Sequence, residues 1–102
     1  MKPPNNFIRI VNQKRYSVAT ATLIAHNAYW DGHNFERNGT NTFLYRTSRG
    51  AYFVVTLTQW QGALDTLEPI SQEEAIEEYE GALPEHVVPY SEAFPGVIVE
   101  EA

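Results

Sequence analysis

Residues 42–57 have the sequence TFLYRTSRGAYFVVTL, in which two β patterns rich in aromatic residues flank a short turn. Side chains alternate along both halves with the period of two that is typical of strands. Gly50 supplies the positive φ that a tight hairpin turn needs. The stretch therefore predicts a long antiparallel hairpin at the middle of a sheet.

The chain before this hairpin predicts a smaller hairpin and one further strand. Residues 7–11 alternate as a strand does, and residues 12–14 form a turn into a second strand at 15–18. Residues 19–30 mix alanine, which favours helix, with threonine and aromatic residues, which favour strand. We expect a helical turn near 18–21 followed by a strand, and a ten-residue helix is the alternative.

Two polar loops bracket the central hairpin. Residues 31–41 are rich in Gly, Asn and Asp, and residues 61–66 form the second loop. Both lie at the open end of the hairpin and would emerge at the same end of the sheet. Indoles beside polar groups are typical of binding surfaces, although burial of both indoles in the core is an equal alternative. The candidate binding residues of these loops are Trp30, Asp31, His33, Glu36 and Trp60.

Residues 71–81, SQEEAIEEYEG, predict a short acidic helix. Ser71 and Glu74 have the spacing of a capping box, and Gly81 suits the position just after the helix. Its outward acidic face is made of Glu73, Glu77 and Glu80. Its apolar stripe is made of Ala75, Ile76 and Tyr79. We expect this stripe to dock on a sheet face lined by Phe53, Val55 and Leu57.

These elements predict an α+β domain: a mostly antiparallel sheet of about five strands, one C-terminal acidic helix packed on it, and an extended tail. We place the domain at residues 1–81 and the acidic, proline-containing tail at 82–102. Prolines rule out a continuous helix in the tail. Its apolar clusters at 87–90 and 97–99 indicate pairing with a sheet edge, in this chain or in a partner. Exchange of the tail between two copies would form a homodimer.

The composition is that of one folded domain: 102 residues, 43% hydrophobic and 13% aromatic. The absence of cysteine excludes disulfides, thiolate metal sites and cysteine nucleophiles. The polar N-terminus lacks the apolar segment of a signal peptide, and no apolar run approaches membrane-spanning length. We therefore expect a cytoplasmic protein with no membrane partner.

Charge is divided sharply along the chain. Residues 1–50 carry all seven Lys and Arg and two acids, whereas residues 51–102 carry eleven acids and no base, giving +5 and −11 and a net charge of −6. The simplest explanation is that the acids keep a helix and the tail solvated. The functional explanation is that a partner binds either the basic or the acidic half of the molecule. The candidate basic face consists of Arg9, Lys14, Arg15, Arg46 and Arg49.

No pattern typical of catalysis or of a cofactor is present. The glycines are isolated, the serines suit a strand, a turn, a cap and the tail, and most acids lie on the helix or in the tail. Asp31, His33 and Glu36 have the residue types of a metal site, but their spacing matches no metal motif. We expect no catalytic residue, no metal and no cofactor.

The expected function is therefore a non-enzymatic protein–protein interaction module with an acidic binding surface and an unknown protein partner, such as a mobile-element or phage-type accessory or inhibitor protein. The alternative is a nucleic-acid-binding protein, in which the basic residues act together with exposed rings of the sheet. The rings in question are Tyr16, Tyr45 and Tyr52. A small enzyme is the third possibility.

Three pieces of the chain stand out as a set: KRY at 14–16 with TA at 20–21, LYRT at 44–47 running to Gly50 and Phe53, and EPIS at 68–71 with EEA at 73–75. Together they resemble a loose pattern in small, mostly uncharacterised bacterial and mobile-element proteins. The resemblance spans Ile10 to Glu80 and omits the tail. It implies a bacterial protein with these hairpin and cap features, and it implies no active site.

Overall fold

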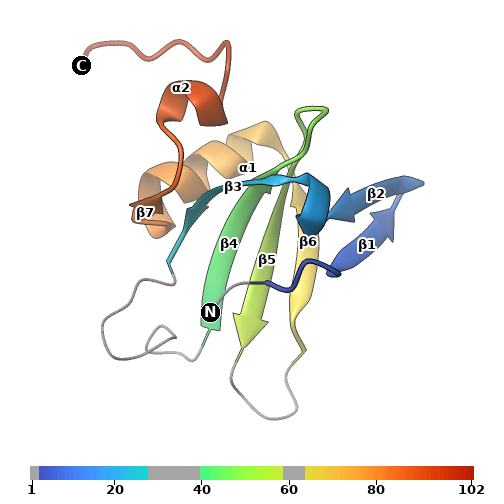
Figure 1. Cartoon of the computed structure of the whole chain (residues 1–102). Coiled ribbons are helices and arrows are strands. Elements are labelled where there is room, and N and C mark those ends of the chain that lie inside the picture. The colour runs from blue at the N-terminus through green and yellow to red at the C-terminus, as the bar shows by residue number, and fades with distance from the viewer. Residues whose placement is uncertain (1–2, 28–39, 59–63) are drawn as a thin grey trace.

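The structure, a computed structural model, describes residues 3–27, 40–58 and 64–102. Its strands are β1 (Ile8–Val11), β2 (Lys14–Ser17), β3 (Thr22–His26), β4 (Thr40–Arg46), β5 (Tyr52–Thr58), β6 (Thr66–Ile70) and β7 (Glu85–His86). Its helical elements are η1 (Val18–Thr20), α1 (Gln72–Glu77), η2 (Glu78–Ala82) and α2 (Tyr90–Ala93). The strands form the two-stranded β1–β2 sheet and an antiparallel five-stranded sheet in the order β6-β5-β4-β3-β7 (Figure 1). The predicted α+β fold with a five-stranded antiparallel sheet is confirmed.

The central hairpin forms as its sequence predicts. β4 and β5 pair antiparallel over their whole length, with Phe43 opposite Val55. Thr47 closes the turn, because its N–H donates to the Ala51 carbonyl (2.8 Å) and its carbonyl accepts from the Gly50 N–H (3.0 Å). Gly50 has φ 85°, the left-handed conformation that the turn requires.

The N-terminal hairpin and the strand after it are also confirmed. Asn12 and Gln13 both adopt positive φ, 52° and 65°, as a two-residue turn of the primed type demands. The short turn η1 then leads into β3, so the alternative of a ten-residue helix is wrong. The β1–β2 hairpin, however, forms a separate sheet and is not part of the five-stranded one.

Two of the five strands, β6 and β7, were not predicted as such. β6 contains Pro69, which lacks an amide hydrogen and so weakens the strand signal of residues 66–70. Pro69 is compatible with the sheet because β6 is an edge strand. β7 pairs at the other edge, with His86 opposite Ala25 of β3.

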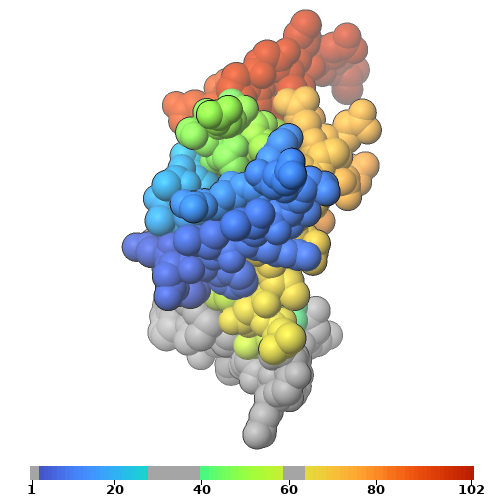
Figure 2. Space-filling model, turned by 90° about the vertical axis from the view of Figure 1, so that its right-hand side faces the viewer, coloured from blue at the N-terminus to red at the C-terminus, as the bar shows by residue number. Residues whose placement is uncertain are grey.

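Both faces of the five-stranded sheet are covered, which makes three layers. The β1–β2 hairpin packs on one face, and the helix layer, defined here as residues 72–94, packs on the other (Figure 1). Figure 2 shows the β1–β2 hairpin in front of the sheet and the green turn between β4 and β5 directly above it. The core under the hairpin contains Tyr16, Val18, Phe43, Tyr45, Phe53, Val55, Leu57 and Leu67. The core under the helix layer contains Ile24, Ala25, Leu44, Tyr52, Ala75, Tyr79, Leu83, Ala93 and Phe94.

The predicted docking of the helix on Phe53, Val55 and Leu57 is therefore wrong. Those three side chains point to the β1–β2 hairpin, whereas Ala75 and Tyr79 pack over the alternate positions of β5, represented by Tyr52. The sequence could not distinguish the two faces, because β5 is apolar on both and either set has the period of a strand.

The capping box of α1 is present. Ser71 Oγ accepts a hydrogen bond from the Glu74 N–H, and Glu74 Oε1 accepts one from the Ser71 N–H, both at 3.1 Å. The expected glycine stop at Gly81 is wrong, because the helix widens into the π-helical turn η2, which ends at Ala82 and is followed by Leu83 with φ −114°. No helix within the described ranges is long and apolar enough to cross a membrane.

Residues 83–97 of the C-terminal segment fold back on the helix side of the sheet. Leu83 and Phe94 are fully buried, and Tyr52 Oη donates a hydrogen bond to the Ala93 carbonyl (2.7 Å). The Val87 N–H donates to the Ile24 carbonyl (3.0 Å), which continues the pairing of β7 with the edge strand β3. After Val97 the chain has no regular structure, and Ile98 is 85% exposed.

We expect Ile76→Ala to lower the free energy of unfolding by about 1–2 kcal/mol, because Ile76 is only half-buried against the helix-side core. A fully buried isoleucine would cost more. Urea unfolding followed by circular dichroism measures the change, with Glu77→Ala as the control because Glu77 is exposed on the same helix. An Ile76 effect no larger than that of the control would mean that α1 does not pack on the sheet.

Candidate functional site

The predicted interaction loops lie outside the described residues. Trp30, Asp31, His33, Glu36 and Trp60 all fall in residues 28–39 and 59–63, so the proposed aromatic surface stays a prediction. In the described part of the chain, no three His, Asp or Glu side chains are grouped closely enough to hold a metal ion.

The five candidate basic residues do not share one face. Arg9 lies between β1 and the edge strand β6, where its Nη1 donates to the Leu67 carbonyl (2.8 Å) and to Glu68 Oε1 (3.0 Å). Arg46 stands opposite Tyr52 in the β4–β5 register and therefore belongs to the helix side of the sheet. Its Nε is buried without a hydrogen-bond partner. The expected basic face is wrong for these two residues.

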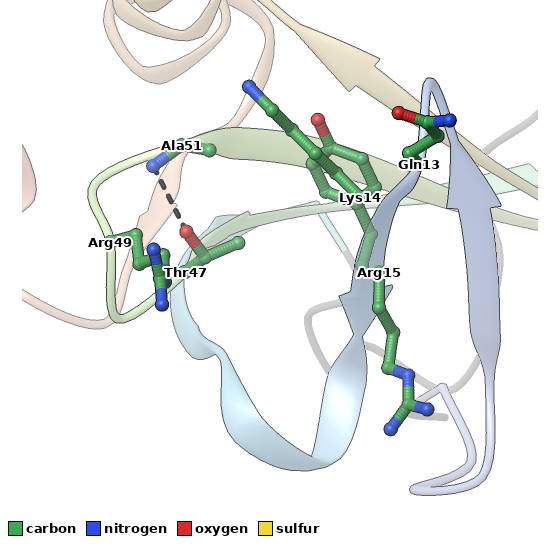
Figure 3. A pocket seen from close by; sticks show the side chains of 7 residues that line it. Gln13, Lys14, Arg15, Thr47, Arg49 and Ala51 are labelled. Carbon is green, nitrogen blue, oxygen red and sulfur yellow. Dashed lines mark hydrogen bonds between the residues drawn. The ribbon is translucent and has the colours of Figure 1, made fainter.

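The remaining three basic residues meet at a hollow between two hairpin turns (Figure 3). Lys14 and Arg15 come from the start of β2, where they leave the strand in opposite directions, and Arg49 comes from the turn between β4 and β5. The hollow has a volume of about 520 Å³. Its wall consists of Gln13, Lys14, Arg15, Tyr16, Thr47, Arg49 and Ala51. Sequence reasoning missed Gln13 and Thr47, although both occupy turn positions beside predicted basic residues.

The three tyrosines that were candidates for stacking on nucleobases are buried. Tyr45 stacks on Phe53 with a centroid distance of 5.1 Å, and Tyr16 packs edge-on against Phe53 at 5.9 Å. Burial raises the pKa of Tyr45 to about 12. Tyr52 points to the opposite side, into the helix-side core. The predicted platform of exposed rings is therefore absent from these positions, because the two cores use all three.

The acidic residues Glu73, Glu77 and Glu80 are exposed on α1 and η2, as the sequence predicts. The one ion pair within residues 3–27, 40–58 and 64–102 joins Arg9 to Glu68. Glu73 and Glu77 thus have no cationic partner in that part of the molecule. Glu80 Oε2 accepts a hydrogen bond from Tyr90 Oη (2.9 Å). Burial, and then this bond to Glu80, raise the pKa of Tyr90.

A group of packed rings fixes this acidic face to the sheet, and sequence reasoning did not find it. Tyr79 is stacked on His86 (3.8 Å) and lies edge-on to Tyr90 and Phe94. Tyr79 Oη donates to the Val88 carbonyl (2.8 Å), and His86 Nε2 lies 2.7 Å from the Tyr79 carbonyl. Burial raises the pKa of Tyr79. The spacing of these residues along the chain has no helical or strand period, so only the folded chain brings them together.

The fold and these side chains define a small α+β domain with an acidic helix layer on one side of the sheet and a cluster of cations at a hollow on the other. No family model, no curated protein and no solved structure matches the chain.

Proposed function

We propose that the protein is a non-enzymatic interaction module that binds a basic surface of a partner protein through the acidic face made of Glu73, Glu77 and Glu80. The observation that carries this proposal is the lack of any cationic partner for Glu73 and Glu77 in the described part of the chain. A partner with Lys or Arg side chains at matching positions would supply the missing charge.

The acidic face is destabilising for the isolated helix. Glu73 and Glu77 are four residues apart and Glu77 and Glu80 three apart, so each pair repels by a few tenths of a kcal/mol. Glu80 lies in the last turn, where a negative charge opposes the helix dipole. Sequences depart from locally favourable choices mainly at functional sites, and a basic partner would relieve this repulsion.

The face is also held rigidly, which favours binding because little ordering is needed when a partner arrives. The capping box fixes the first turn of α1, and the stack of Tyr79 on His86 fixes η2 against the sheet edge. Closely spaced carboxylates present to a basic surface a charge pattern like that of a phosphate backbone. This suits an accessory or inhibitor protein of the mobile-element or phage type.

Titration with a lysine-rich peptide tests the proposal. The ¹⁵N-labelled full chain should show its largest amide shifts at residues 73–80, and the triple variant Glu73→Gln/Glu77→Gln/Glu80→Gln should bind about tenfold more weakly or worse. The control variant, Glu92→Gln/Glu100→Gln/Glu101→Gln, removes the same charge elsewhere on the helix side and near the chain end. Equal weakening in the two variants would mean that net charge alone attracts the peptide, and the proposal would fail.

Nucleic-acid binding has less support as a function. It would need exposed rings beside a continuous basic surface, but Tyr16, Tyr45 and Tyr52 are buried and the basic residues are divided between the two sides of the sheet.

A further inference from the structure

The hollow between the β1–β2 turn and the β4–β5 turn carries positive charge, and no described acidic side chain forms an ion pair with it. Lys14, Arg15 and Arg49 border it, and its wall contains no Asp or Glu. Residues 3–27 and 40–58, which supply the whole wall, contain no acidic residue at all. Arg9, the basic residue that does form an ion pair, is paired away from the hollow with Glu68 on β6.

The backbone around the hollow is fixed on both sides. On one side, Asn12 and Gln13 are held in the left-handed conformation by the tight β1–β2 turn. On the other, Thr47 Oγ1 accepts a hydrogen bond from the Ala51 N–H (3.0 Å), which leaves the hydroxyl hydrogen available to donate to a ligand. Tyr16 anchors β2 to the sheet by its edge-on contact with Phe53. The cations therefore extend from a rigid frame, although their own side chains are exposed.

We propose that this hollow binds a small phosphate-bearing ligand, with a di- or triphosphate chain held between Lys14 and Arg49 and with Arg15 at the rim. Guanidinium groups match phosphate oxygens with two parallel N–H donors, and the lysine ammonium adds a point charge. Gln13 and Thr47 add neutral donors on the same wall. The volume of about 520 Å³ lies within the range of small-molecule sites and exceeds what one phosphate group fills.

A small ligand fits the observations better than a nucleic-acid strand. The three basic residues border one hollow and do not follow a groove, and Tyr16, the ring in the wall, is buried and packs against Phe53. A long polyanion would also be repelled by the net charge of −6. This site lies on the side of the sheet away from the acidic face and does not depend on the function proposed for that face.

The test is a titration of the ¹⁵N-labelled full chain with inorganic pyrophosphate, then with adenosine triphosphate, at low salt. Amides of residues 13–16 and 47–51 should shift. Lys14→Gln and Arg49→Gln should each weaken binding about tenfold, because each removes a charge-assisted hydrogen bond from a different hairpin. Arg9→Gln is the control. Like Lys14→Gln it removes one positive charge from the β1–β2 hairpin, but Arg9 lies away from the hollow, so this variant should bind the ligand as tightly as the wild type does.

Three results would overturn the proposal. If Arg9→Gln weakened pyrophosphate binding as much as Lys14→Gln, the anion would be attracted unspecifically by positive charge. If sulfate bound as tightly as pyrophosphate, the hollow would be an adventitious anion site. Tighter binding of a single-stranded oligonucleotide than of adenosine triphosphate would assign the surface to nucleic acid. The Glu73→Gln/Glu77→Gln/Glu80→Gln variant should retain pyrophosphate binding, so that failure here and failure of the proposed protein interaction are distinguishable.

Discussion

Phe94→Ala should lower the free energy of unfolding by about 3–5 kcal/mol. Phe94 is fully buried in the helix-side core. Its ring packs against Tyr52 and Tyr79, both with centroids at 5.4 Å, and against Tyr90 at 5.1 Å. Removal of the ring would leave a cavity between the sheet and the C-terminal segment, and would weaken the contact that holds this segment in place.

Urea unfolding measures this effect, and Val99→Ala is the control because Val99 is 71% exposed in the same segment. The control should change stability by no more than about 0.5 kcal/mol. A Phe94 effect as small as that of the control would mean that residues 83–97 do not pack on the sheet. The homodimer formed by exchange of this C-terminal segment stays a prediction. If the dimer forms, the urea midpoint of the wild type should rise with protein concentration.

The free energy of unfolding should fall as the pH rises from 10 to about 12. Ionisation of Tyr45 alone should account for about 2–3 kcal/mol of this loss. Burial raises the pKa of Tyr45 from 10.0 to about 12 in the folded chain. Between these values the unfolded chain loses the phenol proton and the folded chain keeps it, so unfolding becomes more favourable as the pH increases. Below pH 10 both states are protonated and the stabilisation is fully present.

The matched variant is Tyr45→Phe, which keeps the ring stacked on Phe53 and removes the ionisable group. Tyr79 and Tyr90, whose pKa values are also raised, remain in both proteins and contribute equally. As the pH rises through this range, the free energy of unfolding of the wild type should therefore fall more than that of Tyr45→Phe. A difference that does not vary with pH would mean that the Tyr45 hydroxyl is solvated in the folded state.

The positions of charged residues in the sequence predict only in part where charges gather on the folded surface. Glu73, Glu77 and Glu80 lie on the continuous helical segment α1–η2, so their exposure on a common face follows from helical geometry. The basic residues are distributed over three strands and a turn, and their neighbours depend on strand pairing. The β4–β5 register places Arg46 on the helix side of the sheet, and the packing of the β1–β2 hairpin brings Arg9 to Glu68. Lys14 and Arg49, thirty-five positions apart in sequence, border one hollow.

The sequence alone determined the features that depend on a few neighbouring residues. The β4–β5 hairpin, its turn at Gly50 and the capping box at Ser71 each result from local backbone preferences and hydrogen bonds between residues close together in sequence. Three other features depend on the folded chain as a whole: which face of β5 meets the helix, the place of Pro69 in an edge strand, and the part of Phe94 in the helix-side core. These features depend on the burial of apolar surface, and the hydrophobic effect is not directional. Which residues become buried therefore depends on which apolar surfaces of the sheet are still exposed when the other elements pack against it.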